Sequence, residues 1–582
     1  MIEKYYEEEL RYLIDSGKEF ARAHPDRGRF LNIDAIGDRD PYVERLFEGF
    51  AFLAARIREK IDDSFPELTE GLLDLLWPQL LEEIPSLSIT EFIPRKAFLQ
   101  ETRVIERGAE ILSNSVGPEA CMCRFTTTQN VYMHPLELRR VTHEVNRRNQ
   151  ATLHFNFIIN PGAQWENMKL EPLQLYLHAE IPTALMLHQF LTRKVIKASV
   201  KLNTLPDPVE IAPQQATSPG GMSPDEALLA GDSRSFWGYA LLREYFVFPE
   251  KFMFVDLNRI STIPTPAEPP TEFTCSLTFD AEFPHDYPFG QENFRLYCTP
   301  VANISSTEAE PIIHDGLDSE YRVIADSSYP ESAKTHSVIG VVGIDRSTGE
   351  RQVYQPFHTF KHISGPSSRC YTSNYRITPD GRRHCFIRLG GDKLEEGQLR
   401  EESLSVRIRL TNGELPRDEI QEGGINKPGS GFPDYVAVRN ITRPTLPKLP
   451  PGDSDFMWKF LAHLASTYTT LADADTFKSV LKLYDWSGSE GRSRRIDAIA
   501  HIEALAVSKA CMGSIVHGVR FTVTIQEAHF SDTGDLHLFG QVLKEFLAHY
   551  ISINSFVELI MVLKPSGKAQ RWDSLEGKQW LI

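Results

Sequence analysis

Between residues 85 and 450, apolar and polar side chains alternate in short runs, and turn-forming residues separate these runs. Clear examples are 153–158, 173–177 and 404–410. A period of two is typical of a strand that buries one face, while Gly, Pro, Asn and Asp between the runs favour turns. The sequence therefore predicts a large β-rich middle region. Two stretches inside it, 204–226 and 422–433, have the composition of loops, which either divide subdomains or extend towards a partner.

The first 80 residues show helical spacing instead. One amphipathic helix is predicted from Tyr6, a second begins at Asp40 and Pro41, and a third ends before Pro78. About 80 residues make a thin core, so their wide apolar stripes imply a partner chain or the next domain. We predict that these faces enter a helical bundle shared with a partner. The candidate interface residues are Leu10, Leu13, Phe20, Phe47, Phe50 and Ile57.

The last part of the chain follows a proline-rich joint at 443–451, whose composition suits a semi-rigid linker. Helical spacing at 456–468 is followed by a predicted helix near 495–510 and a strand at 519–525. A helix through 538–550 and a closing strand at 556–563 complete it. The expected fold class is α+β. We predict four parts: a helical segment (1–84), two β-rich domains of sandwich-like subdomains (85–260 and 261–442) and a C-terminal α+β domain (443–582).

Charge narrows the class of partner. The 582 residues include 62 Lys and Arg against 79 Asp and Glu, a net charge of −17. Such a surface repels nucleic-acid phosphates and anionic lipid headgroups, so nucleic acid is not an expected partner. The first 100 residues alone hold 21 acidic and 13 basic side chains. This excess acid is expected on the outer faces of the predicted helices.

Targeting signals are few. The start is too acidic for a signal peptide, and no apolar run is long enough to cross a bilayer. The seven cysteines form an odd and sparse set, which favours reduced thiols over disulfides. We therefore expect a soluble protein of the cytoplasm.

Motifs for catalysis or metal binding are nearly absent. The run 343–350 resembles a phosphate-binding loop but lacks the following Lys, so a hairpin turn is the favoured interpretation. No nucleophile elbow, zincin helix or dinucleotide fingerprint occurs. Cys370 with His384 and Cys385 is the best candidate metal group, and buried thiols explain it better. The sequence predicts no enzyme, no cofactor and no metal.

Stretches spread over the whole chain resemble TssF, the baseplate subunit of the type VI secretion system of Gram-negative bacteria. They occur in the family's order and are 5–13, 19–25, 40–57, 65–69, 242–252, 298–303, 354–357, 538–543 and 550–556. Two departures concern local packing. Ile304 and Ser305 stand where the family has Leu-Phe, and Thr467 stands where Asn is frequent.

The resemblance implies a structural role without a small-molecule substrate. TssF-like proteins join a TssG partner, two copies to one, in a wedge similar to those of contractile phage tails. Wedges that also carry TssK and TssE surround a central spike hub and form the platform for the tail tube and sheath. The resemblance implies a cytoplasmic baseplate that docks at the inner membrane through other subunits.

Two other classes of function remain open from the residues alone. One is a β-sandwich hydrolase acting on carbohydrates, whose two carboxylates would be far apart in sequence and so leave no motif. The other is a monomeric ligand-binding module. A stable complex with a coexpressed partner would favour the scaffold, whereas a well-behaved monomer with an acidic cleft would favour the hydrolase.

Overall fold

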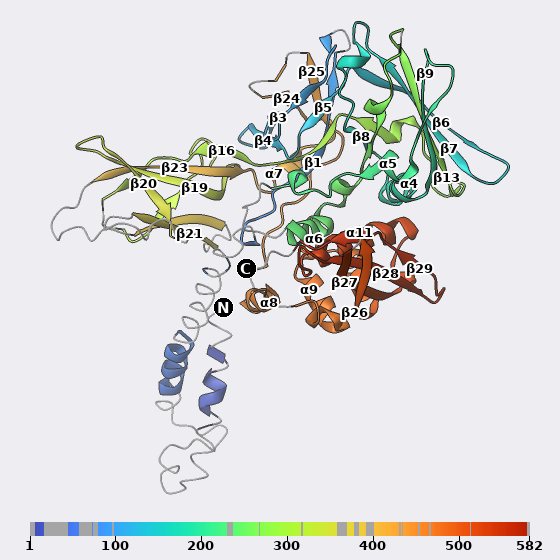
Figure 1. Ribbon diagram of the computed structural model, residues 1–582. Helices are drawn as coiled ribbons and strands as arrows, with labels where there is room; N and C mark the ends of the chain where they lie inside the picture. Colours follow the sequence, from blue (N-terminus) through green and yellow to red (C-terminus); the bar gives the residue numbers. More distant parts are fainter. Residues whose placement is uncertain are drawn as a thin grey trace. The chain divides into compact units, whose positions relative to one another are not determined.

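The computed structural model describes residues 6–7, 9–14, 16, 45–56, 71, 73, 80–95, 98–229, 237–266, 268–315, 318–357, 369–377, 383–390, 401–429, 432–433, 435–451, 454–464, 467–511 and 514–578 (Figure 1). The chain forms two compact units, one of residues 1–81 with 452–464 and one of residues 82–451 with 465–582. Helices and six sheets occur in the described part, which confirms the α+β fold class. The division into four parts stays a prediction.

The first unit is helical in its described residues. Residues 9–14 and 45–56 are helical, and helix α8 spans Ser454–Leu464. The predicted helices from Tyr6 and after Asp40 are thus found where they can be followed. Helix α8 lies in the same compact unit although it follows the whole β-rich region in sequence. Residue 468, which was expected to continue its register, lies beyond the helix.

A six-stranded sheet forms the middle of the second unit. Its strand order is β24-β3-β4-β15-β1-β25. The strands are β1 (Leu87–Pro94), β3 (Glu110–Val116), β4 (Cys121–Thr127), β15 (Cys298–Ala302), β24 (Ile425–Pro428) and β25 (Val436–Asn440). Strands β15 and β1 pair with each other, and β15 and most of β1 are buried on both faces. Strands β2 (Arg103–Ile105) and β5 (Val131–Met133) form a separate pair beside it.

Two further sheets pack face to face around an aromatic core. The five-stranded sheet, in order, contains β10 (Val209–Ile211), β9 (Val195–Leu202), β13 (Glu272–Phe279), β7 (Ala151–Ile159) and β6 (Leu136–Val145). The four-stranded sheet contains β11 (Thr217–Pro219), β12 (Phe254–Leu257), β8 (Leu173–Leu177) and β14 (Phe294–Leu296). Phe155 of β7 meets Phe294 of β14 edge to face, with ring centroids 5.1 Å apart. Alternate residues of β7 and β13 are buried, as their period of two predicts.

Short helices join these strands. They are α4 (Ile181–Arg193), α5 (Pro213–Ala216), α6 (Trp237–Val247), η3 (Trp165–Asn167), η4 (Pro224–Glu226), η5 (Pro249–Phe252), η6 (Ile260–Thr262) and η7 (Gln291–Asn293). The loop-like stretch 204–226 therefore contains β10, α5, β11 and η4.

An eight-stranded sheet extends the second unit. Along the order β16-β23-β19-β20-β21-β22-β18, with β17 also on β23, the strands are β16 (Ser305–Glu308), β23 (Glu402–Thr411), β19 (Lys334–Asp345), β20 (Arg351–Pro356), β21 (Cys370–Ile377), β22 (Arg383–Gly390), β18 (Tyr321–Val323) and β17 (Ile312–His314). Its core gathers Val341, Ile387, Leu404, Val406 and Ile408. Strands β19 and β20 form the hairpin predicted at 343–350.

Buried amides fasten this sheet to the six-stranded one. Asn303 follows β15, and its Nδ2 donates to the carbonyl of Arg124 (2.8 Å) and to Oδ1 of Asn412 (2.9 Å). Its Oδ1 accepts from the backbone N–H of Asn412 (2.7 Å) and from Thr411 Oγ1 (3.1 Å). Asn412 Nδ2 in turn donates to the carbonyl oxygen of Ser332 (2.9 Å). Helix α7 (Leu415–Glu419) begins shortly after Asn412 in the chain. Because Asn303 and Asn412 are buried, every one of these bonds replaces water.

A C-terminal α+β region completes the second unit. Helices α9 (Ala474–Lys482), α10 (Glu490–Asp497) and α11 (Thr533–Ala548), with η9 (Thr470–Ala472) and η10 (Glu527–His529), accompany one sheet. The sheet holds β26 (Ile499–Cys511), β27 (Ser514–Gln526), β28 (Phe556–Lys564), β29 (Ala569–Arg571) and β30 (Leu575–Glu576). Strand β28 runs parallel to β27 because α11 crosses over between them.

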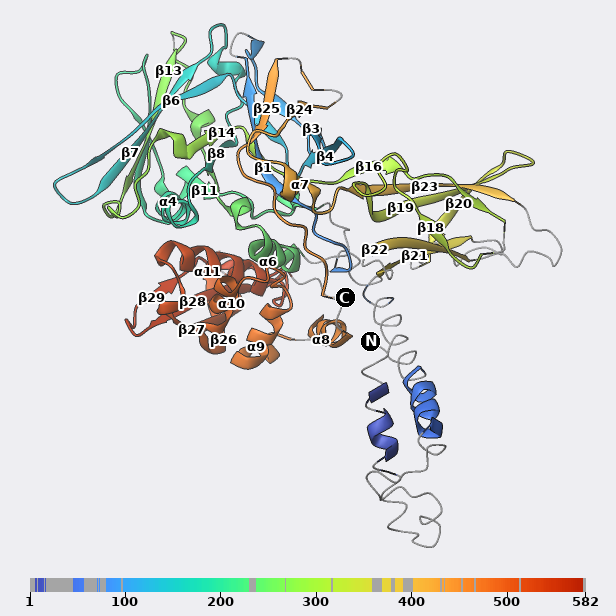
Figure 2. The ribbon, with the colours of Figure 1, turned by 180° about the vertical axis from the view of Figure 1, so that it is seen from behind.

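Helix α11 also attaches this region to the β-rich part. It packs against α4 and α6, and the three helices lie together in both views (Figures 1 and 2). At its start, a Cβ on Gly534 would lie 2.6 Å from the carbonyl oxygen of Leu185, so only glycine allows this approach. Asp535 forms a buried ion pair with Arg495 (3.0 Å), whose guanidinium donates to Tyr245 of α6 (3.2 Å). The C-terminal region is thus fixed to α6.

Two local predictions differ from the structure. The helix expected near 495–510 is wrong, since α10 ends at Asp497 and β26 begins at Ile499. The joint at 443–451 is hydrogen-bonded along the start of β1: Thr445 N donates to the Leu87 carbonyl (2.8 Å), and Ile84 and Lys448 form an antiparallel bridge. These backbone hydrogen bonds hold the joint against the β1 region, where its composition predicted a semi-rigid linker.

Candidate functional site

The predicted interface residues are only partly visible. Phe20 and Ile57 lie outside the described residues. Leu10, Leu13 and Phe47 are half-buried, whereas Phe50 is 58% exposed. Their contact with a partner stays a prediction.

The helix at 45–56 carries two different apolar faces. Ala51 and Ala55, four residues apart, are completely buried. Leu46, Phe50 and Leu53 are each 58% exposed. Their spacing of four and three residues places them on one stripe of the helix. The apolar stripe predicted from the sequence ran through Phe47, Phe50 and Ile57 and did not include Ala51 or Ala55. The structure shows that the small side chains face inward, and we name the exposed stripe of Leu46, Phe50 and Leu53 the outer stripe.

Helix α8 adds a similar feature to the first unit. Met457, Phe460 and His463 are buried, and burial lowers the pKa of His463 to about 4. Trp458 is 51% exposed. Large exposed aromatic side chains are enriched at protein–protein contacts, so Trp458 extends the set of candidate anchors. Sequence reasoning placed this helix in a separate C-terminal domain and therefore missed it.

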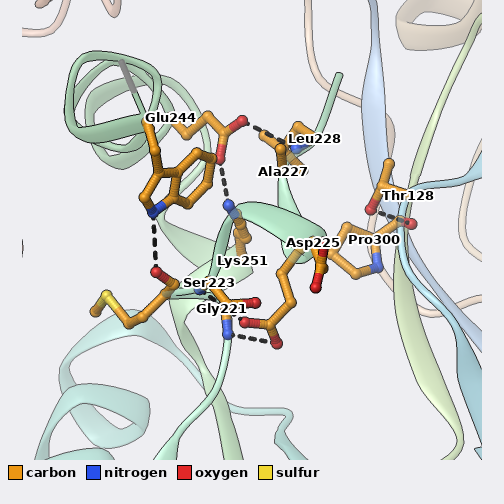
Figure 3. A network of polar contacts seen from close by, with 12 residues as sticks. Thr128, Gly221, Ser223, Asp225, Ala227, Leu228, Glu244, Lys251 and Pro300 are labelled. Atoms are coloured by element: carbon orange, nitrogen blue, oxygen red, sulfur yellow. Dashed lines mark hydrogen bonds and ion pairs between the residues drawn. The ribbon is translucent and has the colours of Figure 1, made fainter. Parts of the chain in front are cut away.

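Among the described residues of the second unit, Lys251 and Glu244 form a buried ion pair (Figure 3). The ammonium group of Lys251, which is fully buried, bonds to Oε2 of Glu244. Oε1 of Glu244 accepts from the backbone N–H of Leu228 (2.9 Å). The Lys251 Nζ also lies 4.7 Å from the centre of the Trp237 ring. A charge without water needs such a set of partners, so the pair holds α6 to η5 and to Leu228.

The segment 220–229, here called the strap, is bonded to Glu244 through Leu228 and to Trp237 through Met222, and Glu226 braces it internally. Trp237 Nε1 donates to the carbonyl of Met222 (3.0 Å). The carboxylate of Glu226 accepts from the N–H groups of Gly221 (2.9 Å) and Ser223 (3.0 Å). Gly221 has φ of +77°, and a Cβ there would collide with the carbonyl of Lys251. Glu244 and Lys251 are seven residues apart, which was the only sequence signal for this network.

Asp256 of β12 lies beside the strap and is partly buried. Its Oδ1 accepts from Gln174 Nε2 (3.0 Å). Burial, together with the nearby carboxylate of Glu226, raises the pKa of Asp256 to about 6, from an ordinary value of 3.8. Ionised Asp256 therefore costs the folded protein free energy at neutral pH.

We expect Asp256→Asn to stabilise the protein at pH 8 by about 2 kcal/mol and to change little at pH 4. The folded state binds this proton more tightly than the unfolded chain, so the carboxyl group removes stability as pH rises from about 4 to about 6. Asn keeps the hydrogen bond from Gln174 without the charge. Urea unfolding at both pH values measures the difference, and Asp207→Asn at an exposed aspartate is the matched control. Equal effects of Asp256→Asn at pH 4 and pH 8 would contradict the expectation.

The candidate metal group does not assemble. Cys370 lies opposite Gly390, whereas Cys385 lies opposite Tyr375, so the two thiols are separated along the β21–β22 ladder. Within the described ranges, no group of three or more metal-binding side chains occurs. Burial raises the pKa of Cys123, Cys275 and Cys385 to about 12, which keeps these thiols protonated and poorly nucleophilic. No helix among the described residues is both long and apolar enough to cross a membrane.

Comparison with known proteins defines the class of protein to which this arrangement belongs, a component of a bacterial secretion machine. The family model described as "Type VI secretion system, TssF" matches residues 1–579, and the chain belongs to this family. The type VI secretion system component TssF1 of Pseudomonas aeruginosa is 27% identical over 635 residues, covering 99% of this chain and 98% of that protein.

Two solved structures agree with this assignment. A chain of the TssK-TssF-TssG baseplate subcomplex of the type VI secretion system, determined by cryo-electron microscopy, matches with a TM-score of 0.76 and 33% identity, covering 91% of this chain and 98% of that chain. A chain of the baseplate complex from the type VI secretion system matches with a TM-score of 0.64 and 32% identity, covering both chains completely. The resemblance found from the sequence motifs is thereby confirmed.

Proposed function

We propose that this protein is a noncatalytic structural subunit of a type VI secretion baseplate, in which it binds TssG-like and TssK-like proteins. The observation that carries the proposal is the match over nearly the whole chain to a protein of the TssK-TssF-TssG subcomplex. The family is described as part of the type VI secretion system, and this description favours a structural subunit over the alternative of a β-sandwich hydrolase.

The finer proposal concerns the wedge. Two copies of this chain join one TssG-like subunit, and wedges with TssK-like and TssE-like proteins surround the spike hub. They form the platform on which the tail tube and sheath assemble, in the cytoplasm at the inner membrane. The outer stripe supports partner binding physically, because three large apolar side chains in water gain free energy when a partner covers them.

Coexpression with a TssG-like partner tests the proposal. We expect a stable complex with a mass of two copies of this chain to one partner, measured by size-exclusion chromatography with light scattering. A chain that stays monomeric beside a folded TssG-like protein would overturn the assembly proposal. A complex with another ratio would overturn only the two-to-one wedge.

Phe50→Asp is expected to abolish copurification with the TssG-like partner while leaving the fold intact. Phe50 is mostly exposed, so the charge costs little in the free chain but is expensive inside an apolar interface. Arg45→Asp introduces the same side chain at another exposed position of the same helix and is the matched control. If both variants copurify with the partner as well as the parent does, the outer stripe is not an interface.

A further inference from the structure

The contact of α11 with α4 and α6 contains three buried histidines. His188 lies on α4, His537 lies on α11, and His549 directly follows α11. Their side chains are 0%, 5% and 8% exposed. The contact attaches the C-terminal region to the β-rich part, and its three helices lie together in both views (Figures 1 and 2). Histidine is the side chain whose charge changes closest to neutral pH, so its burial here links the attachment to protons.

His188 is enclosed without any hydrogen bond to its ring. In the part of the chain that the structure describes, neither Nδ1 nor Nε2 has a partner. The ring faces His537, with ring centroids 6.3 Å apart. An imidazolium at this place would bury a charge and leave two N–H donors without acceptors. Burial lowers the pKa of His188 to about 4. The contact therefore closes only around a neutral His188.

The hydrogen bonds of His537 also select the neutral ring. Thr192 Oγ1 donates to the carbonyl oxygen of His188 (2.7 Å), so it accepts from Nε2 of His537 (3.3 Å). Nδ1 of His537 lies 3.4 Å from Nε2 of Gln570, which only donates. A second proton on His537 would thus meet a donor. Burial, with the charges nearby, lowers the pKa of His537 well below its ordinary value of 6.5.

His549 makes the same demand at the contact with α6. Its Nε2 accepts from the backbone N–H of Gly238 (2.8 Å), in the first turn of α6. A Cβ on Gly238 would lie 2.1 Å from the imidazole, so ring and backbone are in close contact. A proton on Nε2 would break this bond and turn two N–H groups towards each other. Burial lowers the pKa of His549 to about 4, and the neighbouring Tyr239 stays neutral because burial raises its pKa.

The charges that act on these rings are basic. They come from Arg193 and Lys544 beside His537, from His188 when it is protonated, and from Lys578 beside His549. The acids nearby have other partners: Glu545 pairs with Lys578 (2.7 Å), and Asp573 faces Arg193 and Lys544. A proton taken up by the contact therefore adds to positive charge that is already present.

We propose that the contact of α11 with α4 and α6 is an acid-sensitive joint, which opens when its histidines take up protons while the sheets on either side stay folded. The opened rings reach water, where an imidazolium is well solvated. The sheets lack this sensitivity, since the core of β7 is made of side chains such as Phe155 and Phe157, which do not titrate. The joint belongs to this chain and does not depend on the proposed assembly.

The direction of the pH effect follows from linkage. In the open joint we expect the ordinary pKa of 6.5, and in the closed joint the pKa of His188 and of His549 is about 4. The closed joint thus binds fewer protons. It is fully stable above about pH 6.5 and loses stability as the pH falls towards 4. Between pH 8 and pH 5, each of these two histidines shifts the equilibrium towards the open joint by about 30-fold.

Hydrogen exchange of the full chain at pH 8 and pH 5, corrected for the pH dependence of the chemical exchange rate, tests the joint. We expect the protection of α4 and α11 to fall by at least about 100-fold at pH 5, while that of β7 and β13 changes by less than about threefold. His188→Met fills the same space without a titrating ring and should make the fall at least about tenfold smaller. His285→Met, at a histidine that is 93% exposed, is the matched control and should not change it.

The parent chain alone decides the proposal if His188→Met fails to fold at pH 8, which thermal unfolding shows. A fall in protection confined to α4, α11 and the start of α6 supports the joint. Equal corrected protection of α11 at both pH values would overturn it. A fall in β7 as large as that in α11 would do so too, because the second unit would then unfold as a whole. A folded His188→Met variant with the same fall as the parent would also contradict the proposal.

Discussion

Lys251→Met is expected to lower the free energy of unfolding of the second unit by about 3–5 kcal/mol. The substitution removes the positive charge but leaves the carboxylate of Glu244 buried, with the N–H of Leu228 as its remaining partner. An uncompensated charge in this position is much more costly than the pair that it replaces. Urea unfolding followed by tryptophan fluorescence measures the loss. Hydrogen exchange should increase first in the strap.

Two comparisons make this prediction specific. Lys251→Met combined with Glu244→Gln should recover most of the loss, because Gln accepts from Leu228 without a charge. Lys197→Met removes the same side chain from an exposed ion pair with Glu210 (2.8 Å) and should cost less than about 1 kcal/mol. A double variant no more stable than Lys251→Met alone would show that lost packing, and not the unpaired charge, is the cause.

Asn303→Leu should be about as destabilising, at about 3–5 kcal/mol, and its effect should concentrate in the eight-stranded sheet. Four hydrogen bonds disappear together, and buried donors and acceptors of Arg124, Thr411 and Asn412 lose their partner. Hydrogen exchange resolved along the chain measures the result, with faster exchange expected in β16 and β23. The junction between the two sheets would then open more often than either sheet does.

Asn426→Leu is the control for this substitution. Asn426 of β24 is exposed, and its Nδ2 donates to the carbonyl of Gly423 (3.0 Å) just before the strand. It should change the stability by about 0.5 kcal/mol or less. If Asn303→Leu behaves like this control, the buried amides do not hold the two sheets together.

Strands with regular alternation could be predicted from the sequence, because burial of one face imposes it directly. Strands β7, β8 and β23 lie where the runs 153–158, 173–177 and 404–410 predicted them. Which strands pair could not be predicted. Strand β1 pairs with β15 and β25, which come from far along the chain, and an apolar run carries no label for its partner.

Strand β26 shows why local propensity was insufficient. The segment Ile499–Cys511 is rich in Ala and also holds Leu, Glu and Lys, all good helix formers. It nevertheless pairs with β27 along almost its whole length. The hydrogen bonds to β27 and the burial of Ile502 outweigh an intrinsic preference of a few tenths of a kcal/mol per residue.

The candidate sites were accessible to sequence reasoning to very different degrees. Helical spacing identified the apolar stripe around Phe50, but it did not point to Ala51 and Ala55, which the structure shows to be buried. The ion pair of Lys251 and Glu244 gave almost no signal, because Leu228, which completes it, lies in a separate segment and no motif links the three residues.

The order of strands in the six-stranded sheet has a consequence for synthesis of the chain. Strand β1 leaves the ribosome about 200 residues before β15, its buried neighbour, and later still comes β25. At about 5–20 residues per second, β1 waits for about 10–40 s with both edges unpaired. An apolar strand with free edges invites pairing with other chains. Protection of β1 during this interval should therefore determine how much protein reaches the folded state. A chaperone could cover the strand, or slow initiation of translation could keep neighbouring nascent chains apart.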